Sequence, residues 1–350
     1  MDRKELHKLS ETLSKEWGRE VVLVSAEQRT GGFLSDAFLL TSQKGEKFFL
    51  KRVKKNGEAG FELPERYLFS HAVSHGMGRR ATLSPVPLGV IVSRKDEMTV
   101  LPEIDEQTSL YHLQEFSPHE SISYWSLLQE RRAKKKMDEQ DKKEIEEIVD
   151  LLSIIHATPL PSKNVKILKT LYNDSVHTLL AYPGFFFTFL ADYTDTHHLL
   201  PRKKHAYYIG LILKIFYKCH DHYKRLRPLH GDFWGTNIYF KKDGGAIAVD
   251  FSRIPYGDAG IDLGFFVIQF LWFYHETKNE YFRELGESFI ERYKQKTGDK
   301  RVREFLCLPF GLLALLYLNP RFHPDNNPAV EKSFFGAVIK SLKKHTLMWK

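Results

Sequence analysis

The stretch from residue 229 to residue 251 restricts the fold of this chain more than any other part of the sequence. It reads His230-Gly231-Asp232, four further residues and Asn237, followed by Asp250 at the end of the apolar run Ala248-Val249. The segment Ile238-Tyr239-Phe240 predicts a short strand that pins Asn237 against the core. We therefore expect a polar loop that presents a carboxylate and an amide, and a second carboxylate after the next apolar run.

These groups suit phosphoryl transfer. Asp232 is the candidate catalytic base, because an acceptor hydroxyl must lose its proton as the phosphoryl group arrives. Asn237 and Asp250 are candidate Mg²⁺ ligands, since Mg²⁺ prefers oxygen and usually binds through one or two protein groups together with phosphates. The octapeptide alone is compatible with a chance match. That interpretation weakens because Gly257-Asp258 and Asp262-Leu263 follow Asp250.

Lys51 is the candidate nucleotide-binding lysine. It ends the apolar run Phe48–Leu50, so its point charge could reach nucleotide phosphates. Such a lysine needs a carboxylate to hold it, and Glu65 in the next predicted helix is our choice, with Glu62 as the alternative. Basic residues follow Lys51, which also fits a solvated patch, but the downstream motif favours a function.

The first hundred residues predict a strand-rich lobe with a helix over 61–74. A further short amphipathic helix is expected over 6–17, and strands over 21–24, 37–41, 48–53, 88–93 and 98–101. Gly31 and Gly32 lie between two of these strands and could let backbone N–H groups approach phosphates. A Gly-Gly pair is weak evidence by itself, because any hairpin can use one.

From about residue 105 helical periodicity predominates. The sequence predicts helices over 130–155 and 207–223, a strand pair over 238–240 and 246–249, and buried helices over 263–274 and 310–318. The charged part of the first helix, 130–147, is expected to be solvated, and its buried stripe is expected at Ile145, Ile148, Leu152 and Ile155. Neither apolar helix reaches the roughly 20 residues of a membrane span.

Composition excludes some classes of protein. The two isolated cysteines, Cys219 and Cys307, indicate a reducing compartment and no disulfide framework. The charged residues after Met1 give no sign of a signal peptide. The formal charge of +8 permits an anionic partner, but its basic residues read as spread along the chain and mixed with acids, so we expect neither nucleic acid nor a membrane as the partner.

Several polar residues are better explained by structure than by chemistry. His156, after an apolar helix face, is expected to be a packed and hydrogen-bonded histidine. His220 and His222 are two apart on a predicted helix, so they do not face each other and we expect no metal there. Asp258 and Asp262 are expected to be structural, and Asp262 is well placed as a helix N-cap.

Together these motifs resemble the aminoglycoside phosphotransferase and choline kinase group, a branch of the protein-kinase-like fold. The resemblance covers about residues 20–275. It implies an α+β, two-lobed fold, with a small antiparallel-sheet N-lobe (1–104) and a larger, mainly helical C-lobe (105–350). It also implies that ATP binds between the lobes with Leu101–Ile104 as the hinge, so that Glu103 joins the cofactor-binding residues, and that Asp262 braces the catalytic loop.

Within this group the chain looks most like the spore-coat-associated kinase-like proteins of endospore-forming bacteria. The resemblance lies in the length, the aromatic-rich middle and the loop version Phe233-Trp234-Gly235-Thr236-Asn237. It implies the mother-cell cytoplasm as the location, possible deposition on the spore coat, and spore coat proteins as partners. Trp234-Gly235-Thr236 replaces the more frequent His-Pro-Gly, and Trp234 could narrow or stack in the acceptor pocket.

Two features argue against a protein kinase. Gly231 stands where those enzymes usually carry an arginine, and too few residues separate Asp250 from Gly257-Asp258 for a long activation segment. We therefore predict an ATP- and Mg²⁺-dependent kinase that phosphorylates a hydroxyl of a small molecule, which the sequence does not name. The alternative is a catalytically weak or inactive structural component of the spore coat. Aminoglycoside resistance is weaker, because the C-terminal half shows no dense acidic cluster.

Overall fold

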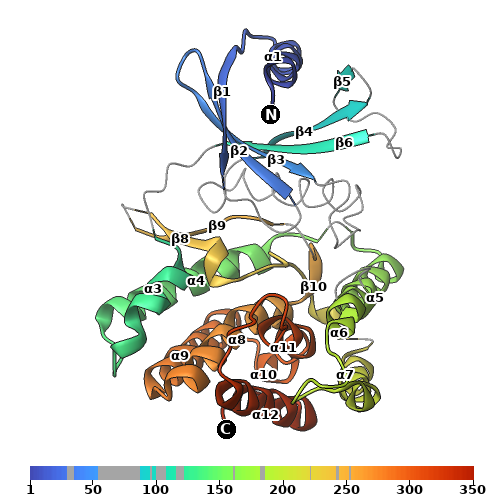
Figure 1. Cartoon of the computed structure of the whole chain (residues 1–350), viewed down its shortest axis with the longest axis vertical. Helices are drawn as coiled ribbons and strands as arrows, with labels where there is room; N and C mark the ends of the chain where they lie inside the picture. The colour runs from blue at the N-terminus through green and yellow to red at the C-terminus, as the bar shows by residue number, and fades with distance from the viewer. Residues whose placement is uncertain are drawn as a thin grey trace. The chain divides into compact units, whose positions relative to one another are not determined.

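The chain divides into two compact units, Met1–Pro118 and His119–Lys350. The computed structural model describes residues 1–29, 35–53, 87–94, 97–99, 108–115, 122–160, 162–181, 186–220, 222–241, 244–251 and 254–350. The domain boundary predicted after residue 104 and the helix predicted over 61–74 lie outside these residues. Each unit is described by itself (Figure 1).

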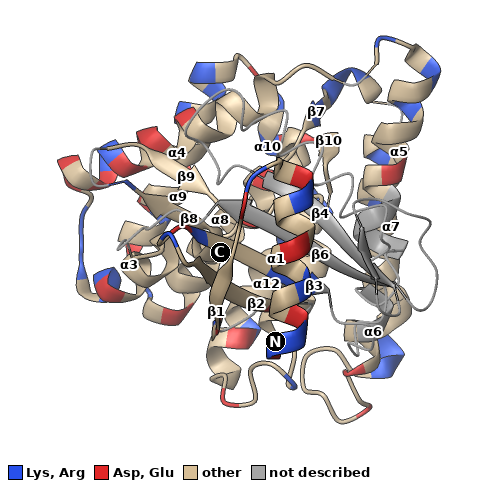
Figure 2. Ribbon diagram, turned by 90° about the horizontal axis from the view of Figure 1, so that it is seen from above, with Lys and Arg blue, Asp and Glu red and all other residues tan. Residues whose placement is uncertain are grey.

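The first unit is an antiparallel sheet with a helix packed on it. The described strands pair in the order β1-β2-β3-β6-β4-β5. Their bounds are β1 Leu23–Arg29, β2 Ser35–Ser42, β3 Lys47–Val53, β4 Pro87–Arg94, β5 Glu97–Thr99 and β6 Thr108–Glu115. Helix α1 (Arg3–Trp17) exposes the charged residues seen in Figure 2 and packs Leu9 and Leu13 into a cluster with Phe38 and Leu50 of the sheet.

The second unit is mainly helical. Its helices are α3 Tyr124–Glu130, α4 Glu139–Ala157, α5 Val165–Ala181, α6 Phe186–Ala191, α7 His205–Cys219, α8 Ala259–Thr277, α9 Glu280–Thr297, α10 Val302–Phe305, α11 Phe310–Tyr317 and α12 Pro328–Lys344. Its short strands are β7 Leu226–Pro228, β8 Ile238–Phe240, β9 Ala246–Ala248 and β10 Tyr256–Asp258. The predicted α+β class, with strands first and helices after, is confirmed.

Helix α8 is the centre of the second unit. Every residue from Ala259 to His275 is buried, and α9, α10, α11 and α12 all pack against this helix (Figure 1). The prediction of a buried helix over 263–274 is therefore confirmed. In the described part of the chain no helix is both long and apolar enough to cross a membrane.

The predicted charged helix over 130–155 is interrupted. Helix α3 ends at Glu130, and α4 begins at Glu139 behind a capping box formed by Asp138 and Asp141. The predicted stripe of Ile145, Ile148, Leu152 and Ile155 is fully buried, as expected. The prediction of a solvated charged face was wrong for Asp141 and Glu144, which are buried and accept hydrogen bonds from Arg131 at 2.9 and 2.6 Å. Burial is tolerated because each charge has a partner.

Two glycines of α8 allow close packing against α10. A Cβ on Gly264 would lie 2.3 Å from the carbonyl oxygen of Leu306, and one on Gly260 would lie 2.5 Å from the carbonyl carbon of Phe305. Both neighbours are backbone atoms, which cannot swing aside. Because neither glycine has a side chain, α8 can approach the backbone of Phe305 and Leu306 this closely.

We expect Gly264→Ala to destabilise the protein although alanine is the better helix former. The intrinsic helix preference favours alanine by about 1 kcal/mol, whereas overpacking costs about 1–3 kcal/mol or more. Gly210→Ala in α7 is the matched control, because nothing lies within 4 Å of its Cβ position. Urea unfolding should show a lower free energy of unfolding for Gly264→Ala and an equal or higher one for Gly210→Ala. Equal gains in both variants would contradict the packing argument.

Candidate functional site

Two strand pairs bring the candidate residues of the second unit together. The loop from His230 to Asn237 runs from β7 to β8; β7 pairs antiparallel with β10, and β8 with β9. The N–H of Val249 also donates to the carbonyl oxygen of Asn237 at 2.9 Å. Asn237 and Asp250, the two candidate metal ligands, therefore lie next to each other although twelve residues separate them in the chain.

Asp262, in the first turn of α8, holds the start of this loop. Its carboxylate is fully buried and accepts the N–H groups of His230 and Gly231, each at 2.8 Å. The prediction that Asp262 is an N-cap was wrong: Asp258 is the cap and accepts the N–H of Gly260 at 2.8 Å. One turn further along the helix, Asp262 points at the loop, and this is the bracing that the resemblance implied.

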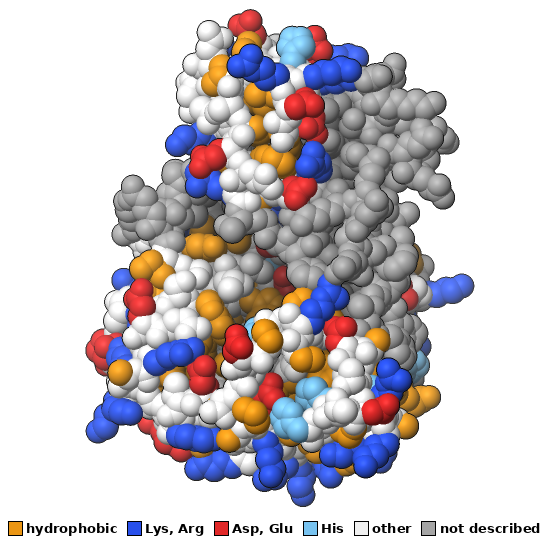
Figure 3. Space-filling model, in the orientation of Figure 1, with side chains coloured by type: hydrophobic (Ala, Val, Ile, Leu, Met, Phe, Trp, Pro, Cys, Tyr) orange, Lys and Arg blue, Asp and Glu red, His pale blue; other side chains and the backbone are white. Residues whose placement is uncertain are grey.

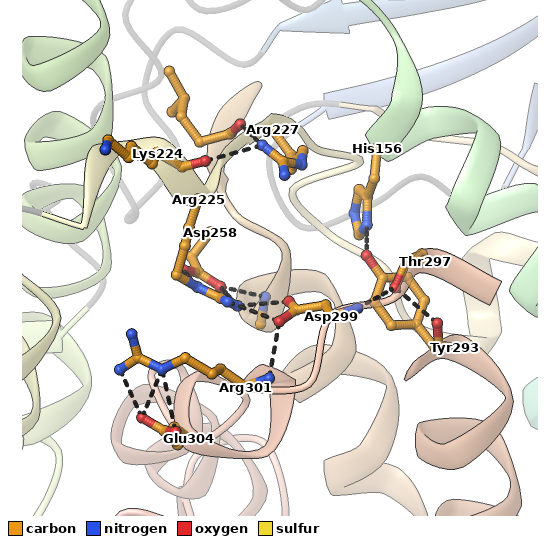
Figure 4. Close-up of polar contacts among 12 residues, drawn as sticks. His156, Lys224, Arg225, Arg227, Asp258, Tyr293, Thr297, Asp299, Arg301 and Glu304 are labelled. Atoms are coloured by element: carbon orange, nitrogen blue, oxygen red, sulfur yellow. Dashed lines mark hydrogen bonds and ion pairs between the residues drawn. The ribbon is translucent and has the colours of Figure 1, made fainter. Parts of the chain in front are cut away.

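His156 extends this bracing to α9. One ring nitrogen lies 3.0 Å from Asp262 Oδ2. The other lies 2.6 Å from the hydroxyl of Tyr293 (Figure 4). Since Asp262 can only accept, His156 Nε2 carries the proton on that side. The expectation of a packed, hydrogen-bonded histidine is confirmed.

Gly231 is the glycine of this loop whose backbone conformation itself favours glycine. Its φ of +79° lies in the left-handed region, and a Cβ would lie 2.4 Å from the backbone nitrogen of Ile254. Asp250 also has a positive φ, +67°. An aspartate adopts this conformation more readily than most residues, and such strain is often found at functional sites.

His230 ties the loop to the segment before Asp250. Its Nδ1 accepts the N–H of Asp232 at 3.2 Å, and its Nε2 lies 2.9 Å from the carbonyl oxygen of Val249. Nε2 therefore carries the proton, and the ring is neutral. Burial lowers the pKa of His230, which favours the same neutral form.

Asp232 lies in the middle of the loop and is held by its neighbours. It is 6% exposed. The indole N–H of Trp234 donates to Asp232 Oδ1 at 2.8 Å, and Asn237 Nδ2 lies 2.9 Å from the carbonyl oxygen of Asp232 and 3.4 Å from its Oδ2. With Nδ2 turned to Asp232, the amide oxygen of Asn237 is the atom suited to a metal ion.

Trp234 has a role that the sequence did not predict. Its ring packs against Phe265 and Tyr317, with ring centroids 5.4 and 5.8 Å away, and this packing fixes the direction of its N–H toward Asp232. Stacking in an acceptor pocket was the role expected from sequence. The spacing Asp-x-Trp alone gives no signal for a hydrogen bond to the carboxylate.

In the first unit, Lys51 is half-buried on β3, opposite Ala37 of β2 and His112 of β6. Its neighbour Arg52 does not belong to a solvated patch, because it pairs with Asp36 and Glu5 at 3.0 and 3.3 Å. The other predicted cofactor-binding residues, Gly31, Gly32, Glu65 and Glu103, lie outside the described residues, as does the alternative Glu62.

A buried ion cluster supports the start of α8. Arg225 donates to Asp258 at 2.6 Å and to Asp299 at 2.8 Å (Figure 4). A cavity of about 490 Å³ lies beside this cluster, and its walls include Arg227 and Lys296. Lys296 pairs with Asp150. Arg225 pairs with two aspartates, Asp258 and Asp299. The positive charges around the cavity are therefore offset by negative ones. This cavity therefore has no evident preference for an anion.

The histidines after α7 are not placed as predicted. The helix ends at Cys219 instead of Tyr223, because His220 has extended backbone angles. His220 and His222 therefore do not lie on a helix. Within the described ranges no group of three or more His, Cys, Asp or Glu residues could hold a metal ion by itself. A metal at Asn237 and Asp250 would need further ligands from elsewhere.

We expect Asp262→Asn to loosen the loop. An amide can present only one acceptor, so one N–H of His230 or Gly231 loses its partner, and breaking such buried bonds costs about 2–4 kcal/mol. Hydrogen exchange should become faster at these two amides, and the melting temperature should fall. Glu304→Gln is the control, since its pair with Arg301 is solvent-exposed and worth about 0–1 kcal/mol. Unchanged exchange at His230 and Gly231 would show that Asp262 does not hold the loop.

Comparison with solved structures supports the fold. The chain is similar to an amicoumacin kinase, hAmiN (14% identity, 92% of this chain and 89% of that chain, TM-score 0.58), and to a microcompartment-associated aminopropanol kinase (13% identity, 93% and 95%, TM-score 0.55). It is also similar to the choline kinase LicA from Streptococcus pneumoniae (13% identity, 96% and 98%, TM-score 0.52). The predicted protein-kinase-like fold is confirmed.

Sequence comparison places the chain in a family. No curated protein matches it significantly in sequence. The sequence profile of the phosphotransferase enzyme family, however, matches residues 25–306. This range contains Lys51, Asp232, Asn237 and Asp250 together with the brace Asp262. Because the match covers most of the chain, the protein belongs to the phosphotransferase enzyme family.

Proposed function

We propose that the protein transfers the γ-phosphoryl group of ATP to a hydroxyl of a small molecule. The observation that carries this proposal is the arrangement of Asp232. Its Oδ1 is held by Trp234 at 2.8 Å, and Asn237 lies 3.4 Å from its Oδ2. A carboxylate fixed at this position, next to two oxygen ligands suited to Mg²⁺, fits the family's chemistry.

In this mechanism Asp232 orients the acceptor hydroxyl and takes its proton. Because Oδ1 accepts the indole N–H, Oδ2 is the oxygen that receives the proton. The loop need not rearrange during this step, since Asp262 and His230 already fix its backbone. Such pre-organisation lowers the barrier, because the base is not reoriented during the reaction.

Asn237 Oδ1 and the Asp250 carboxylate would hold Mg²⁺. Both are oxygen donors, and the hydrogen bond from Val249 to Asn237 keeps them adjacent. Two protein groups are enough for Mg²⁺ when nucleotide phosphates complete its shell. When bound, Mg²⁺ and ATP supply charge neutralisation and the phosphoryl group. Lys51, Glu65, Gly31, Gly32 and Glu103 are proposed to bind the nucleotide.

A small molecule is a better acceptor than a protein. Only the residues from Phe251 to Pro255 separate Asp250 from β10, which leaves no room for a long activation segment. The similar structures are named as kinases of amicoumacin, aminopropanol and choline. These three compounds therefore form the first panel of acceptors to test. The narrower prediction, a spore-coat-associated protein of the mother-cell cytoplasm, rests on the sequence resemblance alone.

Asp232→Asn is expected to lower acceptor-dependent ADP release by at least about a thousand-fold while ATP still binds, because the amide cannot take a proton. The acceptors are amicoumacin, aminopropanol and choline, and the fastest is used for the comparison. Asp195→Asn, an exposed loop position, is the control. If Asp232→Asn turns over like the wild type, Asp232 is not the base.

Trp234→Phe tests the positioning of Asp232. Phenylalanine keeps most of the ring packing and removes the N–H, so kcat should fall about ten-fold while KM for ATP stays within about two-fold. Trp272→Phe is the matched control, because Trp272 also stacks on Tyr317, at 5.2 Å, but its ring is not bonded to Asp232. Equal losses of kcat in the two variants would mean that packing alone is responsible.

A further inference from the structure

The positive charge of this chain is concentrated in two segments. Residues 202–219 contain five Lys or Arg and no acid, and residues 332–350 contain five Lys and no acid. Together they contribute +10, more than the +8 of the whole chain. The expectation from sequence that basic residues are evenly mixed with acids was therefore wrong for these segments.

The fold places these segments side by side. The first segment contains α7 and the second contains most of α12, and these two helices pack against each other at the end of the second unit (Figure 1). The ring of Tyr208 lies 5.6 Å from that of Phe335, and Lys343 Nζ lies 5.6 Å from the ring centroid of Tyr207. Burial and the charges of Lys218 and Lys214 also lower the pKa of His345, which follows α12. The lysines of the two helices thus share one surface, here called the α7–α12 surface.

The lysines of this surface differ from other basic residues of the unit. On α9, Arg283, Arg292 and Lys294 each pair with a carboxylate. Among the described residues, no carboxylate lies within ion-pair distance of Lys214 or Lys218 of α7, or of the lysines of α12. Figure 3, which has the orientation of Figure 1, shows mainly blue and orange side chains along the lower edge of the second unit, where α12 lies. A solvated helix face would be expected to mix both signs of charge, as α9 does.

Apolar side chains project from the same face of α7. Tyr207 is 53% exposed, Leu213 39% and Tyr217 81%, whereas Tyr208 and Ile215 on the opposite face are buried. More large hydrophobic side chains are exposed on α7 than on any other described element. The surface therefore combines two tyrosines and a leucine with lysines that have no carboxylate partner among the described residues.

We propose that the α7–α12 surface binds the face of an anionic phospholipid bilayer. Lysines near such a membrane are attracted to its headgroups, tyrosines favour the interface, and a leucine can enter the acyl boundary. Nucleic acid is less suited, because the leucine has no base-stacking role and nearly all the cations are lysines, which lack the bidentate geometry of arginine. This contact needs no spanning helix and is separate from phosphotransfer. It departs from the expectation from sequence that a membrane is not a partner.

Vesicle sedimentation tests the proposal. The full chain should sediment with equimolar phosphatidylglycerol and phosphatidylcholine at low salt, should be released by high salt, and should ignore pure phosphatidylcholine. No sedimentation with the anionic vesicles would overturn the proposal. Release of bound protein by a short polyuridine RNA at stoichiometric amounts, with tighter binding to that RNA than to vesicles, would overturn it in favour of nucleic acid.

Two pairs of substitutions localise the contact. Lys214→Glu with Lys218→Glu should weaken vesicle binding at least ten-fold. Lys163→Glu with Lys166→Glu changes the net charge equally at exposed positions elsewhere and should leave binding within about two-fold. Equal losses in both pairs would mean general attraction by net charge and would overturn the assigned surface. Leu213→Ser with Tyr217→Ser should weaken binding without changing the charge. Turnover without vesicles should be unchanged in every variant, which separates this test from that of the proposed kinase.

Discussion

The buried carboxylate of Asp262 is the interaction on which the site of the second unit depends. It holds two successive backbone N–H groups at 2.8 Å and a histidine at 3.0 Å, with no exposure to solvent. An unpaired charge at this position would be very costly, so the loop, His156 and α8 must assemble together. Because α8 is packed on by four other helices, the whole helical unit fixes the position of this carboxylate.

The chemistry of the loop follows from that anchor. Once His230 and Gly231 are fixed, the His230 ring can bridge to Val249, and Val249 in turn bonds to Asn237. Asp232 then lies in the middle of a loop whose backbone is fixed, and Trp234 sets the orientation of its carboxylate. Each step is a hydrogen bond, and the buried carboxylates of Asp262 and Asp232 are stabilised by N–H donors.

The sequence predicted the elements whose pattern is local. The strands of the hairpin around residues 43–46, the buried stripe of α4 and the loop from His230 to Asn237 follow from periodicity and spacing. The predictions from sequence were wrong or incomplete where contacts between residues far apart in the chain determine the structure. Asp141 and Glu144 are buried because Arg131 meets them, and Asp262 faces the loop because Asp258 caps the helix one turn earlier. Trp234 contacts Asp232 because Phe265 and Tyr317 support its ring, and neither is near it in the chain.

The central claim is that the residues around Asp232 form a magnesium-dependent nucleotide site. Thermal unfolding with ATP, with and without Mg²⁺, on the wild type and Asp250→Ala tests this claim most directly. We expect a rise in Tm for the wild type that requires Mg²⁺ and is absent in Asp250→Ala, because ligand binding to the folded state raises Tm. No rise at millimolar ATP, or an equal rise in Asp250→Ala, would contradict the account.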